Sequence, residues 1–379
     1  MCFVTEILVD INYILITVRV AICNQNIIEI FYNVANETKQ EGIDSMNKAV
    51  KVALASTVLV AGLSANDVLK GSGASFPYSV YQKWIKAYNK ETGLKVDYIK
   101  KGSSKGIKDA KARAVDFAGT DKPLSPKTLK KHSLYQFPAV VGAITMGYNI
   151  PGVHNLRLSR AAIVAIAKGK IKYWDNKLIT KDNPNAKLPH KKLTFVHRAD
   201  GSGTTYNFTY YLSKVSKSWR KHFGAKKSLN WPGDHHIGGK TNSGVAALLK
   251  QTAYSVGYID YADANNNQIE MATVQNRAGK FVAPTLKNFQ AAAAHASLNP
   301  RKDFYSIIAD PKGADSYPMV AATFILVPAE KQTTNKKVTA FYDWAFKNGQ
   351  QIAKDLGFVP LPDALTAKIR KYWEEKGIY

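Results

Sequence analysis

Cysteine is nearly absent from this chain of 379 residues: only Cys2 and Cys23 occur, and both lie in its first tenth. The rest of the chain therefore has no disulfide framework. After Leu63, no stretch approaches the roughly 20 uninterrupted apolar residues that a membrane-spanning helix needs. These absences exclude a disulfide-stapled scaffold and a membrane-spanning body. A hydrophobic content of 45% instead predicts a globular protein, long enough for two domains that share a cleft.

Acidic residues are also scarce. Lys and Arg number 53 against 28 Asp and Glu, which gives a formal charge of +25. Such an excess attracts anions, but it does not distinguish nucleic acid, lipopolysaccharide, anionic lipid and free phosphate. Because no repeat of basic and aromatic residues suggests a platform for nucleic acid, no nucleic-acid partner is expected.

The segment 46–65 has the anatomy of a cleavable secretory signal. Its sequence, MNKAVKVALASTVLVAGLSA, places Lys48 and Lys51 before an apolar run that ends at Leu63 and is followed by small residues. The alternative is a buried N-terminal helix. Asn66, not cysteine, stands at the expected cut, so we predict a periplasmic protein without a lipid anchor.

A secretory signal normally begins at the start of the chain, so one that begins at Met46 is unusual. We interpret residues 1–45 as an over-extended gene start, since the codons for Gln40 to Gly42 can spell a ribosome-binding sequence ahead of Met46. Four basic and six acidic residues precede residue 66, which leaves 49 basic and 22 acidic residues in the body, a charge of +27.

Helical and strand patterns alternate along the body without an internal repeat, which favours an α/β architecture. Val80, Trp84 and Tyr88 are spaced as one helix face, with Pro77 suited to its first turn and Gly93 to its end. Further helices are expected at 107–114, 159–167, 208–215 and 365–376, and strands at 96–98, 115–121, 140–148, 193–197, 256–261 and 319–327.

Three segments share one design, a strand-like stretch followed by small Gly, Ser or Thr residues and a helix start: 71–77 (GSGASFP), 101–106 (KGSSKG) and 198–205 (RADGSGTT). A helix N-terminus offers unpaired N–H groups and partial positive charge, and nearby hydroxyls add donors. Each segment could cradle an oxyanion, although each taken alone could equally be an ordinary cap or turn.

Arg198, Asp200 and Asp121 add charged groups to these segments. Arg198 can present a planar fork to two oxygens of a tetrahedral anion, and Asp200 could hold that fork in place. Asp121 is the informative residue, because a carboxylate beside an anion repels it unless the ligand brings a proton. Monohydrogen phosphate carries such a proton and sulfate at neutral pH does not. The alternatives are a surface ion pair for Arg198 and a turn cap for Asp121.

From about Gly71 to its end, the chain resembles the phosphate-binding proteins of bacterial phosphate-specific ABC importers, which are type II periplasmic binding proteins. The resemblance runs through AVDFAGTDKPLS, YQFPAVVGAI, IAKGKIKYWDN, HRADGSGTTYNFTYYL, IGGKTNSGVAALL, SVGYIDYA and AATFILV. It implies two α/β lobes joined by crossing hinge strands near 140–146 and 319–326. Lobe I would comprise residues 66–142 and 320–379, and lobe II residues 143–319.

Carried over position by position, the resemblance implies a phosphate site and no catalytic residue, metal or cofactor. Hydroxyls would donate from Ser75, Ser103, Ser202 and Thr204, and backbone N–H groups from Phe76, Gly203 and Thr204. Arg198 would bind the anion with Asp200 in support, and Asp121 would accept the ligand's proton. Ser75 stands where the family usually has Thr, and Lys105 where a Gly is common; we expect Lys105 to point into solvent.

The resemblance also implies a monomer that hands phosphate to the membrane permease. Three rival functions remain: a secreted phosphatase or phosphotransferase, a receptor for sulfate or molybdate, and an adhesin that uses the positive charge. An enzyme would need a nucleophile or metal beside the phosphate, and no motif supplies either. The segment 233–241 lacks the second Gly of a P-loop, and adjacent His235 and His236 are expected in a polar loop.

Overall fold

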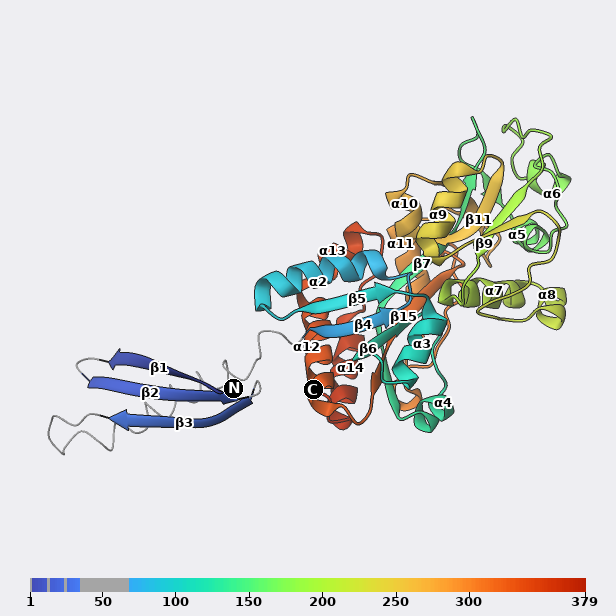
Figure 1. Ribbon diagram of the computed structural model, residues 1–379. Coiled ribbons are helices and arrows are strands. Elements are labelled where there is room, and N and C mark those ends of the chain that lie inside the picture. The colour runs from blue at the N-terminus through green and yellow to red at the C-terminus, as the bar shows by residue number, and fades with distance from the viewer. Residues whose placement is uncertain (1, 12–13, 24–25, 35–67) are drawn as a thin grey trace. The chain divides into compact units, whose positions relative to one another are not determined.

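The computed structural model describes residues 2–11, 14–23, 26–34 and 68–379 (Figure 1). The chain divides into two compact units, residues 1–65 and 66–379, and each is described by itself. In the first unit, strands β1 (Cys2–Ile11), β2 (Ile14–Cys23) and β3 (Asn26–Val34) form an antiparallel sheet in chain order. The predicted signal segment, 46–65, lies outside the described residues.

The second unit is built on a nine-stranded sheet in the order β10-β9-β11-β7-β15-β6-β4-β5, with β12 paired to β7 as well. Its strands are β4 (Leu69–Gly73), β5 (Val96–Lys100), β6 (Phe117–Thr120), β7 (Leu134–Asn149), β9 (Thr194–Arg198), β10 (His236–Gly239), β11 (Ser255–Asp260), β12 (Glu270–Met271) and β15 (Val320–Pro328). A smaller sheet joins β14 (Phe281–Val282), β13 (Thr273–Gln275) and β8 (Arg157–Leu158).

Strand β7 belongs to two half-sheets. Its residues 134–143 pair with β15, which continues to the parallel strands β6, β4 and β5; this is the first half-sheet. Its residues 144–149 pair with β11, which continues to the parallel strands β9 and β10; this is the second half-sheet. One continuous strand thus connects the two halves, and the change occurs between Ala143 and Ile144.

Helices cover both half-sheets. They are α2 (Tyr78–Thr92), α3 (Ser103–Lys111), α4 (Pro126–Lys131), α5 (Arg160–Ala167), α6 (Lys177–Thr180), α7 (Gly203–Val215), α8 (Lys217–His222), α9 (Thr241–Gln251), α10 (Tyr261–Asn266), α11 (Leu286–Ala293), α12 (Gln332–Asn348), α13 (Gln350–Asp355) and α14 (Asp363–Glu375), with a 3₁₀ turn at Pro300–Lys302. In Figure 1, α3 and α4 lie with the first half-sheet, and α5, α7 and α9 with the second. No helix among the described residues is long and apolar enough to cross a membrane.

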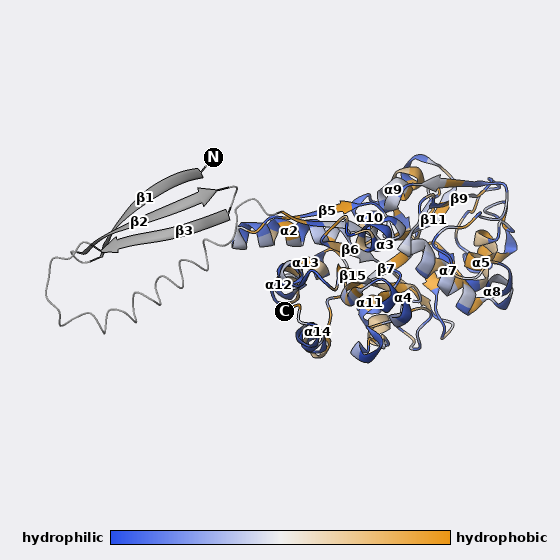
Figure 2. Ribbon diagram, turned by 60° about the horizontal axis from the view of Figure 1, so that its bottom comes forward, coloured by the Kyte–Doolittle hydropathy of each residue, from blue (hydrophilic) through white to orange (hydrophobic). Residues whose placement is uncertain are grey.

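The hydrophobic periodicity explains the first helix of the body. Val80, Trp84 and Tyr88 are all buried, as their spacing predicts, and Gly93 ends the helix with φ 73°, a left-handed conformation that favours glycine. In Figure 2, much of the central strand β7 is coloured as hydrophobic, whereas the outer helices α8 and α14 show broad hydrophilic faces. The core therefore lies between the sheet and the inward helix faces.

Candidate functional site

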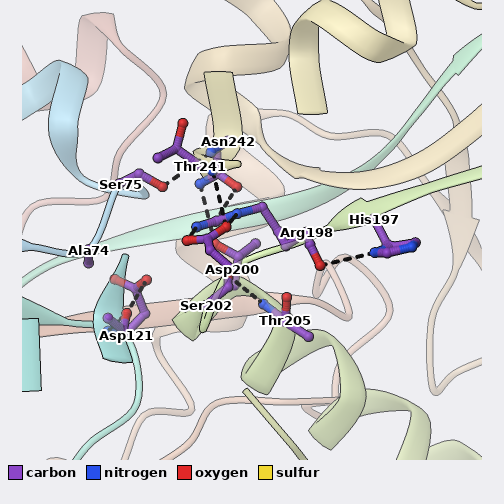
Figure 3. Close-up of polar contacts among 12 residues, drawn as sticks. Ala74, Ser75, Asp121, His197, Arg198, Asp200, Ser202, Thr205, Thr241 and Asn242 are labelled. Carbon is purple, nitrogen blue, oxygen red and sulfur yellow. Dashed lines mark hydrogen bonds and ion pairs between the residues drawn. The ribbon is translucent and has the colours of Figure 1, made fainter. Parts of the chain in front are cut away.

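The site is formed by loops that follow the C-terminal ends of parallel strands from both half-sheets. In the first half-sheet, β4 leads to Ser75, β5 to Ser103 and β6 to Asp121. In the second, β9 ends at Arg198 and leads to Ser202, and β10 leads to Asn242. All six side chains are buried, and Figure 3 shows most of them close together. Ligands of open α/β sheets bind at this edge, where the direction of the strand order changes.

Four hydroxyl oxygens of the site each accept one N–H group from the protein. The N–H of Asn242 donates to Ser75 Oγ (3.2 Å), that of Asp121 to Ser103 Oγ (3.2 Å), and that of Thr205 to Ser202 Oγ (3.0 Å). The Asn242 side-chain amide donates to Thr204 Oγ1 (3.3 Å). Because a hydroxyl has one proton to donate, these bonds leave the O–H groups of Ser75, Ser202 and Thr204 available as donors, whereas that of Ser103 donates to Asp121 Oδ2 (3.3 Å).

Backbone N–H groups add to these donors. Gly203 and Thr204 are the first two residues of α7, so their N–H groups have no carbonyl partner within the helix. The helix N-terminus also places partial positive charge at this point. Phe76 is buried just before α2, and its ring packs edge-on against Phe358 with ring centroids 6.1 Å apart.

Arg198 is fixed by two neighbours. Its Nε and Nη2 donate to the two carboxylate oxygens of Asp200 (2.7 and 2.6 Å), and its Nη1 donates to Asn242 Oδ1 (3.0 Å). The Arg198 side chain is only 1% exposed. Of the five N–H donors of a guanidinium, about two remain for another acceptor. Asp200 therefore has the supporting position that the sequence predicts.

Asp121 is the only carboxylate in contact with the predicted ligand-binding hydroxyls among the described residues. Its Oδ1 accepts from Thr323 Oγ1 (2.7 Å) and its Oδ2 from Ser103 Oγ (3.3 Å). Burial raises the pKa of Asp121 to about 6, although the hydrogen bond from Thr323, the charge of Arg198 and the hydrogen bond from Ser103 each lower it. Asp121 is thus mainly ionised near pH 7.5 and becomes protonated in mild acid.

The two half-sheets meet directly at the site. The N–H of Ser104 donates to the Gly201 carbonyl (2.9 Å), and the Asn207 amide donates to the Asp121 carbonyl (2.6 Å). Glycine allows this approach: a Cβ at Gly203 would stand 2.6 Å from Asp121 Oδ2, and one at Gly102 would collide with Asp200 Oδ2. The structure is therefore that of a closed site, with its polar groups shielded from solvent.

Sequence reasoning missed three residues that organise the site: Asn242, Thr323 and Asn207. Asn242 is fully buried and contacts Arg198, Thr204 and Ser75. The sequence feature that could have identified Asn242 is the small polar run TNSG at the start of a helix, which resembles the design of the three recognised segments. Thr323 was detectable as the single polar residue in the apolar run AATFILV.

The histidines need one correction. We predicted His235 and His236 in a polar loop, but His236 begins β10, and its Nδ1 lies 3.0 Å from Nε2 of His197 on β9. The cause is the parallel pairing of these strands, which short runs do not reveal in sequence. In residues 68–379, no three His, Cys, Asp or Glu side chains are grouped to hold a metal ion.

Comparison with known proteins places this geometry in a family. Residues 49–348 match the family model of the PBP superfamily domain. The chain is 42% identical over 314 residues to the phosphate-binding protein PstS of Haemophilus influenzae, covering 82% of this chain and 93% of that protein. It is 43% identical over 312 residues to PstS of Pasteurella multocida, covering 81% and 90%.

Solved structures agree on the fold. The high-affinity periplasmic phosphate-binding protein PfluDING, solved with bound phosphate, superposes with a TM-score of 0.66 at 20% identity. The match covers 80% of this chain and 93% of that one. At this identity the likeness concerns the fold, which is that of a two-lobed binding protein.

Proposed function

The chain belongs to the PBP superfamily and, within it, to the phosphate-binding proteins named PstS, and we propose that it binds one inorganic phosphate between its two half-sheets and releases it to an ABC importer. It is a phosphate receptor for import, and its role is binding rather than catalysis. The observation that supports the proposed position is an array of buried donors from both half-sheets around the Asp121 carboxylate.

We assign each residue of the array a role in holding the anion. The hydroxyl protons of Ser75, Ser103, Ser202 and Thr204, the N–H groups of Phe76, Gly203 and Thr204, and the two remaining N–H groups of Arg198 donate to phosphate oxygens. The Ser103 hydroxyl, which donates to Asp121 in the structure, turns to the ligand for this role. Asp200 holds the guanidinium in place through two hydrogen bonds. Hydrogen bonds to an anion strengthen in a site from which water is excluded.

Asp121 gives the site its selectivity in this proposal. Its carboxylate accepts the proton of monohydrogen phosphate, whereas sulfate would place an unprotonated oxygen against it. A site built around a ligand proton rejects an analogue that lacks it by roughly 10⁴- to 10⁵-fold. A receptor for sulfate or molybdate would not need this acceptor.

The half-sheets suggest how the site opens. We propose residues 66–142 with 320–379 as lobe I and residues 143–319 as lobe II, hinged where β7 passes from one half-sheet to the other. Hinges commonly lie at a few residues of a connecting segment that absorb the backbone change. Rotation at this point would separate Ser104 from Gly201 and Asn207 from Asp121, which exposes the site.

The setting of the protein is also a proposal. The segment 46–65 would direct export to the periplasm, where the chain acts as a monomer and docks on the membrane permease of the importer. The two relatives named above are phosphate-binding proteins, and the matches cover 93% and 90% of their lengths.

Calorimetry tests this function. We would unfold and refold the purified protein to remove bound ligand, and then titrate phosphate and sulfate separately near neutral pH. Tight one-to-one phosphate binding without sulfate binding is expected. Asp121→Asn, which replaces the acceptor by a donor, should bind sulfate with most of the discrimination lost. Equal binding of both anions by the wild type would contradict the role of Asp121, and binding of neither would contradict the function.

A further inference from the structure

Two lysines flank the site from opposite half-sheets. Lys122 directly follows Asp121 on the loop after β6. Lys227 lies in the loop between α8 and β10, and its carbonyl accepts the N–H of Ser202 (2.9 Å). Each lysine is therefore tied to a residue of the proposed phosphate site. Both are partly exposed, whereas Asp121 and Ser202 are buried.

Both lysines lie beside the first turn of α7, one from each half-sheet. Lys122 Nζ lies 4.7 Å from the ring centre of Tyr206 on α7, so it reaches over the second half-sheet. The Lys227 carbonyl is bonded to Ser202, which directly precedes α7. Burial lowers the pKa of Lys227, and the positive charges of Lys122 and Lys111 lower it further, in agreement with positive charge gathered here.

No anionic side chain balances this pair. Within residues 68–379, neither ammonium has a carboxylate oxygen within 4.0 Å. Elsewhere in the same region, lysines such as Lys101 and Lys347 do have acidic partners, Asp109 and Asp343. Two half-buried cations from opposite sides of a closing interface repel each other, and this repulsion disappears when a dianion lies between them.

We propose that Lys122 and Lys227 form an outer anion site, at the edge of the interface, which holds a divalent oxyanion before the inner site closes on it. This proposal rests on the proposed function, since its physiological occupant is the phosphate dianion on its way inward. The outer site has no acceptor for a ligand proton, so it does not distinguish phosphate from sulfate. Selectivity belongs to Asp121, and the outer site sets the rate of capture.

Stopped-flow association of phosphate, followed by protein fluorescence, tests the outer site. Lys122→Gln and Lys227→Gln should each lower the association rate constant by about 3- to 10-fold at low salt, and weaken its dependence on ionic strength, as expected for lost electrostatic steering. Lys227→Arg keeps the charge and should keep the rate. The matched control is Lys368→Gln, an exposed lysine on α14, which removes the same net charge elsewhere.

Sulfate as a competitor supplies a second measurement. At constant ionic strength, sulfate should slow phosphate association to the wild type without reducing the final amount bound, and this slowing should vanish in the two Gln variants. Association rates equal to that of the Lys368→Gln control, or sulfate inhibition that survives in both variants, would overturn the proposal. Tight equilibrium binding of phosphate by the wild type in the same experiment separates this failure from a failure of the proposed function.

Discussion

At the scale of single residues, the site depends on a carboxylate held in a place that disfavours its charge. Asp121 is buried, and only hydrogen bonds from Thr323 and Ser103 and the nearby Arg198 offset the cost of ionising it. The cost of burying this charge makes the free energy of unfolding depend on pH. A carboxyl group whose pKa is higher in the folded than in the unfolded protein stabilises the fold below its unfolded pKa, and loses that contribution as pH rises through its folded pKa.

We therefore expect ligand-free Asp121→Asn to be more stable than the wild type at pH 8. Since the pKa of Asp121 rises from 3.8 to about 6, the gain is about 3 kcal/mol at most. It should shrink between pH 6 and pH 4 and vanish below pH 4. Urea unfolding at several pH values measures it, and a gain that does not change with pH would mean that burial of the charge is not its cause.

Mild acid should also change ligand selectivity in the wild type. Below pH 6, a protonated Asp121 can donate a hydrogen bond to an oxyanion instead of accepting one. Sulfate affinity should therefore rise as pH falls from 7.5 to 5, whereas in Asp121→Asn it should stay nearly constant. Calorimetric titration of both proteins checks this, and a wild-type sulfate affinity independent of pH would contradict it.

Asn242 shows how one side chain can position several others. It accepts from Arg198 and donates to Thr204. We expect Asn242→Ala to weaken phosphate binding by about 10- to 100-fold, since a hydrogen bond to a charged group contributes about 1.5–3 kcal/mol. The loss should be non-additive with Thr204→Val and additive with Ser103→Ala, measured by calorimetry. Asn266→Ala, at an exposed position on α10, is the control.

At the scale of elements, the parallel strands decide where the chemistry gathers. Each half-sheet has three parallel strands, and each of the site's loops leaves at a C-terminal end. These loops lead into helices, among them α3 and α7, whose N-termini meet from opposite half-sheets. Glycines keep the loops thin enough for backbones to touch, as at Ser104 and Gly201.

Gly102→Ala tests this close approach. Gly102 has φ 86°, and a Cβ there would collide with Asp200 across the interface. We expect phosphate affinity to fall at least about 100-fold because closure is blocked, in line with the cost of overpacking. Gly152→Ala is a matched control, because Gly152 also has positive φ (73°) but nothing within 4 Å of a Cβ. Equal losses in both variants would point to backbone strain instead of collision.

At the scale of the whole molecule, ligand binding and folding are thermodynamically coupled. A ligand that binds only the folded protein stabilises it by about 4 kcal/mol at 1,000 times its dissociation constant. Saturating phosphate should therefore raise the unfolding temperature of the ligand-free protein by several degrees at pH 7.5, while sulfate at the same concentration leaves it nearly unchanged. Differential scanning calorimetry measures both shifts; equal shifts would indicate general anion binding to the positive surface.

The sequence alone predicted the α/β architecture and supplied the candidate residues of the site. Hydrophobic periodicity predicted α2 and its buried face. The positions of Pro77 and Gly93 predicted where this helix begins and ends, because both signals are local properties of the backbone. Apolar runs located the strands β7, β9, β11 and β15 to within a few residues, although β7 begins at Leu134, earlier than expected. The segments with Ser75, Ser103 and Arg198 were singled out because three of them share one design, although each taken alone could be an ordinary cap or turn.

Only the tertiary structure decided how these segments meet. Local patterns could have marked Asn242 and Thr323 as candidates, but not their roles, since the role of a buried amide or hydroxyl is defined by partners that are distant in the chain. The raised pKa of Asp121 likewise arises from burial that no neighbouring residue reveals. The same holds for Lys122 and Lys227, which are about a hundred positions apart in the chain and both lie beside the first turn of α7 in the fold. Properties that depend on the type of a residue could be predicted from the sequence. Properties that depend on which residues lie close together were decided by the tertiary structure.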